Sequence, residues 1–276
     1  MRLEMVPVGI ACRLILWFAE LFARIGGGDF GQKLRKSIMH ILNWGAPSRI
    51  NGMFPHLDTS LVFGFNHPTL GEIIRLLAIL ECEYPNKNFL FPVNIGWYEV
   101  VAPVASRTEK LGLYITPTIT PSTREKMAKI LDEEHMKLVD KLTNEFNYDY
   151  LELCSKFVAE KNIIMIAPSA TRQETVFRNS AQFYGLEKIE PATMTLIALS
   201  LKRAKCKDYL FVPIAVVPPK HRNRRLNLFK IYRIAPCAWI PAENVEKLCK
   251  GRKFEHFFLS RIADELHAMG ASNFIC

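Results

Sequence analysis

The fold is indicated first by Ser60-Leu-Val-Phe-Gly-Phe-Asn-His-Pro-Thr-Leu-Gly-Glu-Ile-Ile-Arg-Leu-Leu-Ala-Ile-Leu80, in which an apolar run gives way to a polar turn and then to a helical pattern. The run over 60–65 is short and rich in aromatic and branched side chains, which is typical of a buried strand. Pro68 disfavours helical geometry at the residue before it and can itself begin a helix. The stretch therefore predicts a strand, a bend and a helix over 71–80.

Apolar runs of the same kind recur along the chain and alternate with helical patterns. The further predicted strands are 88–93, 163–167, 209–217 and 229–234. The further predicted helices are a long stretch over 122–161, then 192–204 and 245–269. Strands that alternate with helices predict an α/β fold with a mixed, mostly buried sheet covered by helices on both faces.

The length and composition favour one large folded domain. The chain has 276 residues, of which 49% are hydrophobic and 23% charged, so it can bury a substantial core. No internal repeat and no Pro-, Gly- or Ser-rich linker divides it. We expect N-terminal helices over residues 1–50 and a single domain over residues 51–276.

The N-terminal segment 6–25 is apolar but is interrupted by Arg13, Glu20 and Arg24, which are costly at the centre of a bilayer. Its large apolar side chains fall at helical spacing, so it is interpreted as an amphipathic anchor helix lying in a membrane interface. An ordinary core-packing helix is the alternative. A second helix, with basic and apolar residues mixed and with a cationic face that includes Arg35, is predicted over 30–44.

The net charge of +9 indicates a surface that attracts anions. No RNA-binding pattern of aromatic and basic residues occurs, so membrane lipids or phosphorylated ligands are favoured over nucleic acid. The seven scattered cysteines form no C-x-x-C pair and no zinc-finger spacing, which indicates reduced thiols in a cytosolic protein and no metal site. The basic run over 220–225 is interpreted as a solvated loop or as a site for anionic lipid or a carrier's phosphate.

His67 and Glu72 are the candidate catalytic pair, because the bend at Pro68 lets them meet although they are five residues apart. A carboxylate beside an imidazole fixes its tautomer and stabilises the imidazolium that forms when the ring accepts a proton. This is what a general base acting on a hydroxyl requires. Alternatively, Thr69-Leu-Gly-Glu72 fits a capping box, in which Glu72 only bonds the backbone at the start of a helix.

Three blocks, in order, resemble motifs of the glycerolipid acyltransferase family, whose best-known members are the lysophosphatidate acyltransferases. Asn66-His-Pro-Thr-Leu-Gly-Glu72 is similar to the N-H-x-x-x-x-D motif of that family. Ala167-Pro-Ser-Ala-Thr-Arg-Gln173 is similar to its F-P-E-G-T-R-S block, and Val212-Pro-Ile-Ala-Val216 to its V-P-V block. The resemblance covers residues 55–240.

The resemblance implies that His67 is the general base and Glu72 its partner. It implies substrate binding by Asn66, Ser169, Thr171 and Arg172, and Arg172 is suited to hold a phosphate with two parallel hydrogen bonds. The acyl donor would be acyl-CoA or acyl carrier protein, with no further cofactor. The acceptor would be a hydroxyl of a (lyso)phospholipid-like molecule in phospholipid biosynthesis. The protein would then be peripheral or monotopic on the cytoplasmic face of a membrane.

The sequence departs from the family pattern at three positions. Glu72 replaces an Asp, which keeps the charge and adds one methylene, while Ser169 and Ala170 replace Glu and Gly. These changes keep two other functions open: a non-catalytic lipid-binding relative, and an O- or N-acyltransferase with a non-glycerolipid acceptor. The segment 116–161 is longer than is usual in the family, and it either covers an acyl chain or forms two helices packed on the sheet.

Overall fold

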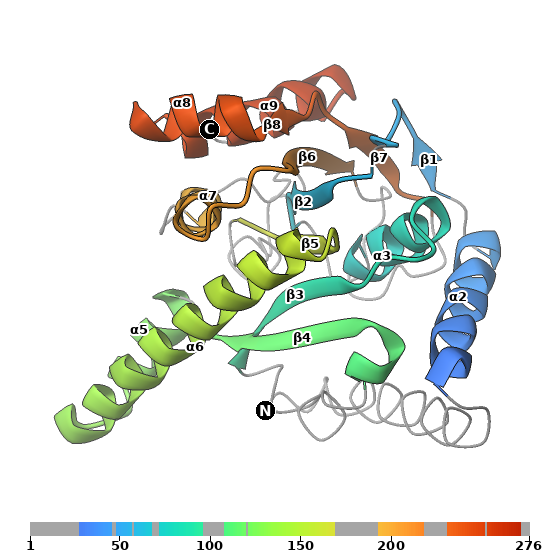
Figure 1. Cartoon of the computed structure of the whole chain (residues 1–276). Helices are drawn as coiled ribbons and strands as arrows, with labels where there is room; N and C mark the ends of the chain where they lie inside the picture. The colour runs from blue at the N-terminus through green and yellow to red at the C-terminus, as the bar shows by residue number, and fades with distance from the viewer. Residues whose placement is uncertain are drawn as a thin grey trace.

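The computed structural model describes residues 28–45, 48–56, 58–67, 72–95, 108–119, 121–168, 193–217, 231–251 and 253–271. These residues form an α/β fold around one mixed, mostly parallel sheet, which confirms the predicted fold class (Figure 1). The predicted anchor helix over 6–25 lies outside the described residues.

Eight strands of the described chain form the sheet. Their bounds are Arg49–Ile50 (β1), Ser60–Phe65 (β2), Phe89–Asn94 (β3), Leu113–Thr118 (β4), Ile163–Ile166 (β5), Tyr209–Val217 (β6), Arg233–Pro236 (β7) and Ile240–Pro241 (β8). The order is β1-β7-β6-β2-β5-β3-β4, and β8 also pairs with β6. Strands β7 and β8 run antiparallel to β6, and the other pairs are parallel.

The parallel pairing brings the carboxyl ends of the central strands to one edge of the sheet. On β2, Gly64 is in register with Ile166 of β5 on one side and with Pro213 of β6 on the other. The chain segments that follow these three strands therefore start side by side. In open α/β sheets this edge is where ligands bind.

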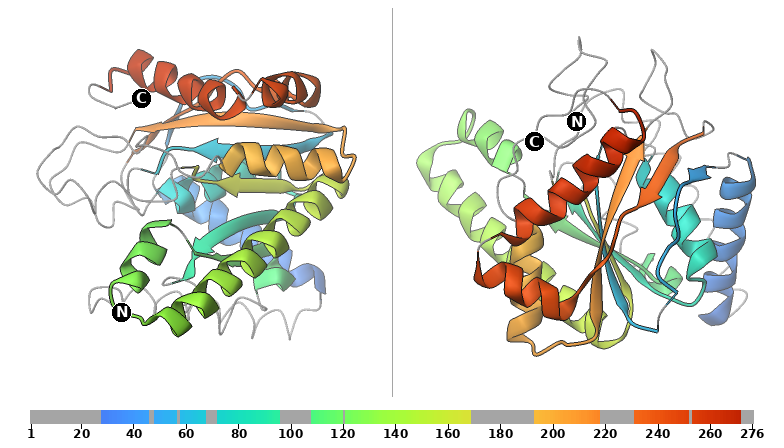
Figure 2. Two further views of the ribbon diagram at one scale, coloured as in Figure 1. Left: turned by 90° about the vertical axis from the view of Figure 1, so that its left-hand side faces the viewer. Right: turned by 90° about the horizontal axis from the view of Figure 1, so that it is seen from above.

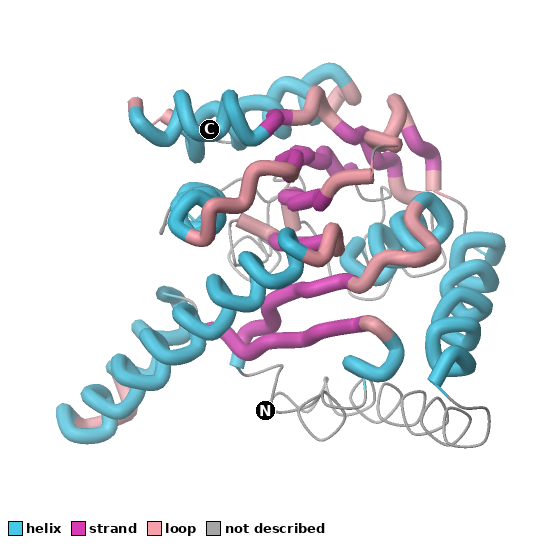
Figure 3. The backbone as a smooth tube through the Cα atoms, viewed as in Figure 1, coloured by secondary structure: helices cyan, strands magenta, loops and turns pink. Residues whose placement is uncertain are grey.

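Helices cover both faces of the sheet (Figures 2 and 3). Their bounds are Gly28–Gly45 (α2), Glu72–Glu83 (α3), Pro121–Ala128 (α5), Glu133–Ala159 (α6), Thr193–Arg203 (α7), Ala242–Lys250 (α8) and Phe254–Ala268 (α9), with a short 3-10 helix at Glu109–Leu111 (η2). Helices α2 and α3 lie on one face, and α6, α7, α8 and α9 on the other.

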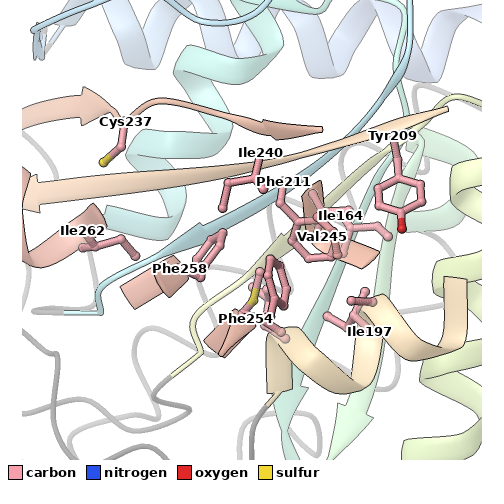
Figure 4. Close-up of a cluster of buried hydrophobic side chains, with 14 of the residues drawn as sticks. Ile164, Ile197, Tyr209, Phe211, Cys237, Ile240, Val245, Phe254, Phe258 and Ile262 are labelled. Carbon is pink, nitrogen blue, oxygen red and sulfur yellow. The ribbon is translucent and has the colours of Figure 1, made fainter. Parts of the chain in front are cut away.

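The alternation of side chains along β2 supplies both cores. Leu61 and Phe63 are buried on the α3 face, whereas Val62 belongs to the cluster on the opposite face. In that second cluster the rings of Phe254 and Phe258 pack against strand β6 (Figure 4). A Cβ on Gly64 would lie 2.5 Å from Phe258, so the glycine lets α9 approach β2 closely.

Several predicted elements differ from the observed ones. The single helix predicted over 245–269 is wrong: the chain forms α8 and α9, and Gly251 ends the first of them. The long stretch over 122–161 forms two helices, as one of its two interpretations expected, and Asp132 begins the second by accepting a hydrogen bond from the backbone N–H of His135. The last predicted strand is displaced to 233–236, and the short β1 and β8 were not among the predicted strands.

A buried ion pair joins α2 to α3. Nε of Arg35 lies 2.8 Å from Oε2 of Glu81, and both side chains are excluded from solvent. Arg35 also donates to the carbonyl oxygens of Leu111 (2.6 Å) and Lys87 (3.1 Å). Burial raises the pKa of Glu81, and the guanidinium opposes that rise. Arg35 thus belongs to the core contact of α2 and not to an exposed basic face.

Replacing Arg35 by methionine is expected to lower the free energy of unfolding by about 3–5 kcal/mol, because it leaves the carboxylate of Glu81 buried without its counter-ion. Urea unfolding would measure the loss. Arg124→Met is the matched control. Nε of Arg124 lies 2.6 Å from Oδ1 of Asp140, but both side chains are exposed, so the urea concentration at the midpoint of unfolding should hardly change. Equal effects of the two variants would contradict the importance of the buried pair.

Within the described ranges, no helix has the length and apolar character needed to cross a membrane.

Candidate active site

The structure brings His67 and Glu72 together at the carboxyl edge of the sheet. Strand β2 ends at Phe65, His67 follows two residues later, and Glu72 is the first residue of α3. Nδ1 of His67 forms a hydrogen bond with Oε1 of Glu72. Residues 68–71, which join them in sequence, lie outside the described chain, and with them the Thr69 of the alternative capping box.

The two side chains differ in their access to solvent. The side chain of Glu72 is 0% exposed and that of His67 is 12% exposed. A buried carboxylate needs a hydrogen-bonding partner, and the imidazole supplies one. With Nδ1 turned towards Glu72, the ring can accept a proton at Nε2, the geometry that a general base acting on a hydroxyl requires.

Asn66 lies beside this pair and contacts the third sequence block. Its side-chain amide donates to the carbonyl oxygen of Val216 at 2.8 Å and accepts from the N–H of Val216 at 2.7 Å. Val216 lies near the end of β6. The structure therefore joins the 66–72 block to the 212–216 block.

The second block begins at the same edge. Ile166, the last residue of β5, is in register with Gly64, and Ala167 follows it. The three predicted substrate-binding residues of this block lie outside the described residues, as does the basic run over 220–225. The three substrate-binding residues are Ser169, Thr171 and Arg172.

Arg75 is a buried residue near the site that the sequence analysis did not single out. It lies one turn after Glu72 on α3, and its Nη1 donates to the carbonyl oxygen of Leu42 in the last turn of α2 at 2.8 Å. Burial lowers the pKa of its guanidinium. Its sequence signal is a single basic residue inside the apolar run over 73–80. Arg75 thereby fixes the helix that begins with Glu72 against α2.

Comparisons with known proteins give a match of fold. No family model and no curated protein matches the chain. The chain superposes on a crystal structure of the 1-acyl-sn-glycerophosphate (LPA) acyltransferase PlsC from Thermotoga maritima with a TM-score of 0.54. The superposition covers 99% of this chain and 94% of the PlsC chain. The chain has a PlsC-like fold. The sequence identity to PlsC is 9%, so the likeness concerns the fold.

Proposed function

We propose that this protein is an acyltransferase that works at a membrane surface and moves a fatty acyl group from acyl-CoA or acyl carrier protein to a hydroxyl of a lysophospholipid-like acceptor. The observation that carries the proposal is the hydrogen bond between His67 and the buried Glu72 in a chain whose fold resembles that of PlsC. The pair lies at the carboxyl edge of the sheet, the edge at which open α/β sheets generally bind ligands.

The proposed reaction is a direct transfer. Nε2 of His67 takes the proton of the acceptor hydroxyl while that oxygen attacks the carbonyl carbon of the thioester. Glu72 keeps the ring in the required tautomer and stabilises the imidazolium. When the tetrahedral intermediate collapses, the C–S bond breaks and the departing thiolate takes the proton back from the imidazolium. This route forms no covalent acyl-enzyme.

The predicted roles of the second block complete the acceptor site in this proposal. Arg172 would bind a phosphate of the acceptor or donor, and Ser169 and Thr171 would bond neighbouring polar groups. The start of this block supports the assignment, because Ala167 directly follows β5 at the sheet edge where His67 follows β2. Ser169 and Ala170 differ from the family pattern, which motivates a non-catalytic lipid-binding protein as the competing function.

A turnover assay separates these functions. The purified protein would be incubated with labelled acyl-CoA or acyl carrier protein and a panel of lysolipids in vesicles, and the lipid products would be separated and identified. The proposal predicts an acylated lysolipid. Product only on an amine or sugar acceptor, in a wider panel, would indicate the acyltransferase with a non-glycerolipid acceptor. Binding of lipid without product from either donor would indicate the non-catalytic relative.

Membrane association is supported by exposed apolar side chains around the end of α2. These side chains are Ile41, Trp44, Ile50 and Met53. Trp44 is 87% exposed and Met53 80% exposed. Tryptophan is favoured at membrane interfaces, where its ring is partly buried and its N–H stays hydrated. Helix α2 directly follows the predicted anchor segment, so both would face the same bilayer.

The double variant Ile41→Ser/Trp44→Ser is expected to bind anionic phospholipid vesicles at least about 10-fold more weakly, because each side chain loses the free energy of burial in lipid. Vesicle co-sedimentation would measure the binding. Ile130→Ser/Leu138→Ser is the matched control, since it removes two exposed apolar side chains from the turn before α6 and from α6 itself. If Ile41→Ser/Trp44→Ser bound vesicles as well as wild-type protein, or if both double variants lost the same affinity, the end of α2 would not be the part of the protein that faces the bilayer.

A further inference from the structure

We propose that Asn66 is a positioning residue for His67. The side chain of Asn66 takes the place of one main-chain residue in the hydrogen-bonding ladder between β2 and β6. The inference rests on the proposed function, in which His67 is the general base. It gives Asn66 a different role from the substrate binding that the family motif implies.

The ladder between β2 and β6 explains why an amide is needed at this position. The two strands pair in parallel register until Phe65, which lies opposite Ile214. Beyond Phe65, strand β6 continues to Val217 while β2 has ended. The N–H and C=O of Val216 are therefore buried main-chain groups next to the end of β2, and unpaired groups of this kind are costly.

The side chain of Asn66 satisfies both of these groups. Its Oδ1 accepts from the N–H of Val216 at 2.7 Å, and its Nδ2 donates to the C=O of Val216 at 2.8 Å. A primary amide carries the same donor and acceptor as a peptide group. An aspartate would have the same shape but would lack the N–H that faces the carbonyl oxygen. An alanine would leave both main-chain groups of Val216 without these partners.

This arrangement sets the direction of the chain at His67. Because the side chain of Asn66 pairs with β6, its main chain need not follow β6 and can leave the sheet at the next residue. His67 is that residue, and its ring meets Glu72 at the start of α3. The two hydrogen bonds to Val216 thus hold the residue immediately before the imidazole against a rigid central strand.

Burial separates positioning from direct substrate binding. Asn66 is 1% exposed, whereas the side chain of His67 is 12% exposed at the same edge. A substrate that reaches the imidazole therefore does not reach the amide unless the residues that cover Asn66 move. The 212–216 block contributes to the site through the main chain of Val216, which explains how an apolar strand segment can be tied to the catalytic pair.

The test compares Asn66→Ala and Asn66→Asp with wild-type protein in steady-state transfer. We expect kcat to fall by about 10²-fold in each variant, because a small displacement of a catalytic group has this effect, while KM for donor and acceptor stays within about twofold. A substrate-binding residue would instead raise KM with kcat largely retained. A rise in KM of that kind, or unchanged kinetics, would overturn the inference.

A second readout does not depend on turnover. The proton on Nδ1 of His67 should give a downfield NMR resonance in wild-type protein, identified by its loss in His67→Ala. We expect this resonance to shift or broaden in both Asn66 variants. If wild-type protein catalyses no transfer, the proposed function fails but the resonance still tests positioning. If the resonance is unchanged in both variants, positioning fails whatever the activity.

Ser60→Ala is the matched control for loss of a buried hydrogen bond on the same strand. Ser60 is fully buried at the amino end of β2, and its Oγ donates to the carbonyl oxygen of Asn162 at 2.6 Å. The variant should lower the melting temperature without changing kcat or the His67 resonance. If Asn66→Ala does not fold, Asn66→Asp, which preserves the side-chain volume, decides the outcome. A loss of kcat in Ser60→Ala equal to that in Asn66→Asp would reduce the effect to general destabilisation and contradict the inference.

Discussion

Replacing His67 by alanine is expected to lower kcat/KM for acyl transfer by about 10²–10⁴-fold, the range that general acid–base catalysis contributes. Without the imidazole, nothing at this position takes the proton of the acceptor hydroxyl during attack on the thioester. The fold should persist, because the ring lies at the edge of the sheet and outside both apolar clusters. Initial rates with a fixed donor and acceptor would measure the loss, and thermal unfolding would verify the fold.

His135→Ala is the control for the His67 variant. His135 also faces a carboxylate, with Nδ1 2.7 Å from Oδ1 of Asp132, but the pair is exposed at the start of α6. Its loss should leave transfer unchanged. A His67→Ala protein with full activity would end the catalytic proposal, whereas a loss of activity together with unfolding would have to be re-examined with His67→Gln.

Replacing Glu72 by glutamine is expected to lower kcat by a factor in the same range of about 10²–10⁴. The amide has nearly the shape of the carboxylate but no negative charge to stabilise the imidazolium, and its NH₂ group can hold the ring in the wrong tautomer. The effect should appear in kcat more than in KM, because it concerns the transition state. Glu72→Asp keeps the negative charge and should retain more activity than Glu72→Gln.

The capping interpretation of Glu72 makes the opposite prediction. A residue that only bonds the backbone at the start of α3 would, when changed to glutamine, lower the melting temperature and leave kcat nearly intact. Measuring kcat and thermal unfolding on the same Glu72→Gln preparation separates the two roles. Retained kcat with a lowered melting temperature would remove Glu72 from the proposed mechanism.

Local sequence patterns predicted much of the fold. The runs over 60–65 and 209–217 form β2 and β6 with these bounds, because their apolar side chains are buried on both faces of the sheet. The helix predicted over 71–80 is observed over 72–83. The break between α8 and α9 was missed although basic residues followed by Gly251 are a common signal of a helix end.

Contacts between distant residues could not be predicted from local patterns. Arg35 was placed on a basic helix face, and only the packing of α2 on α3 brings it to Glu81. Similarly, the partner of Asn66 is the main chain of Val216, which no side-chain motif can indicate. The meeting of His67 and Glu72 was expected because the two residues are only five apart in the chain, and their catalytic role stays a prediction.

The central claim is tested most directly by one rate comparison. Wild-type protein and His67→Ala would be assayed side by side for transfer of a labelled acyl group from its preferred donor to the lysolipid acylated fastest in the panel. The account predicts product from wild-type protein and a rate at least about 10²-fold lower in the variant, with an unchanged melting temperature. Equal rates in the two proteins, or no product from wild-type protein with any donor and acceptor, would contradict it.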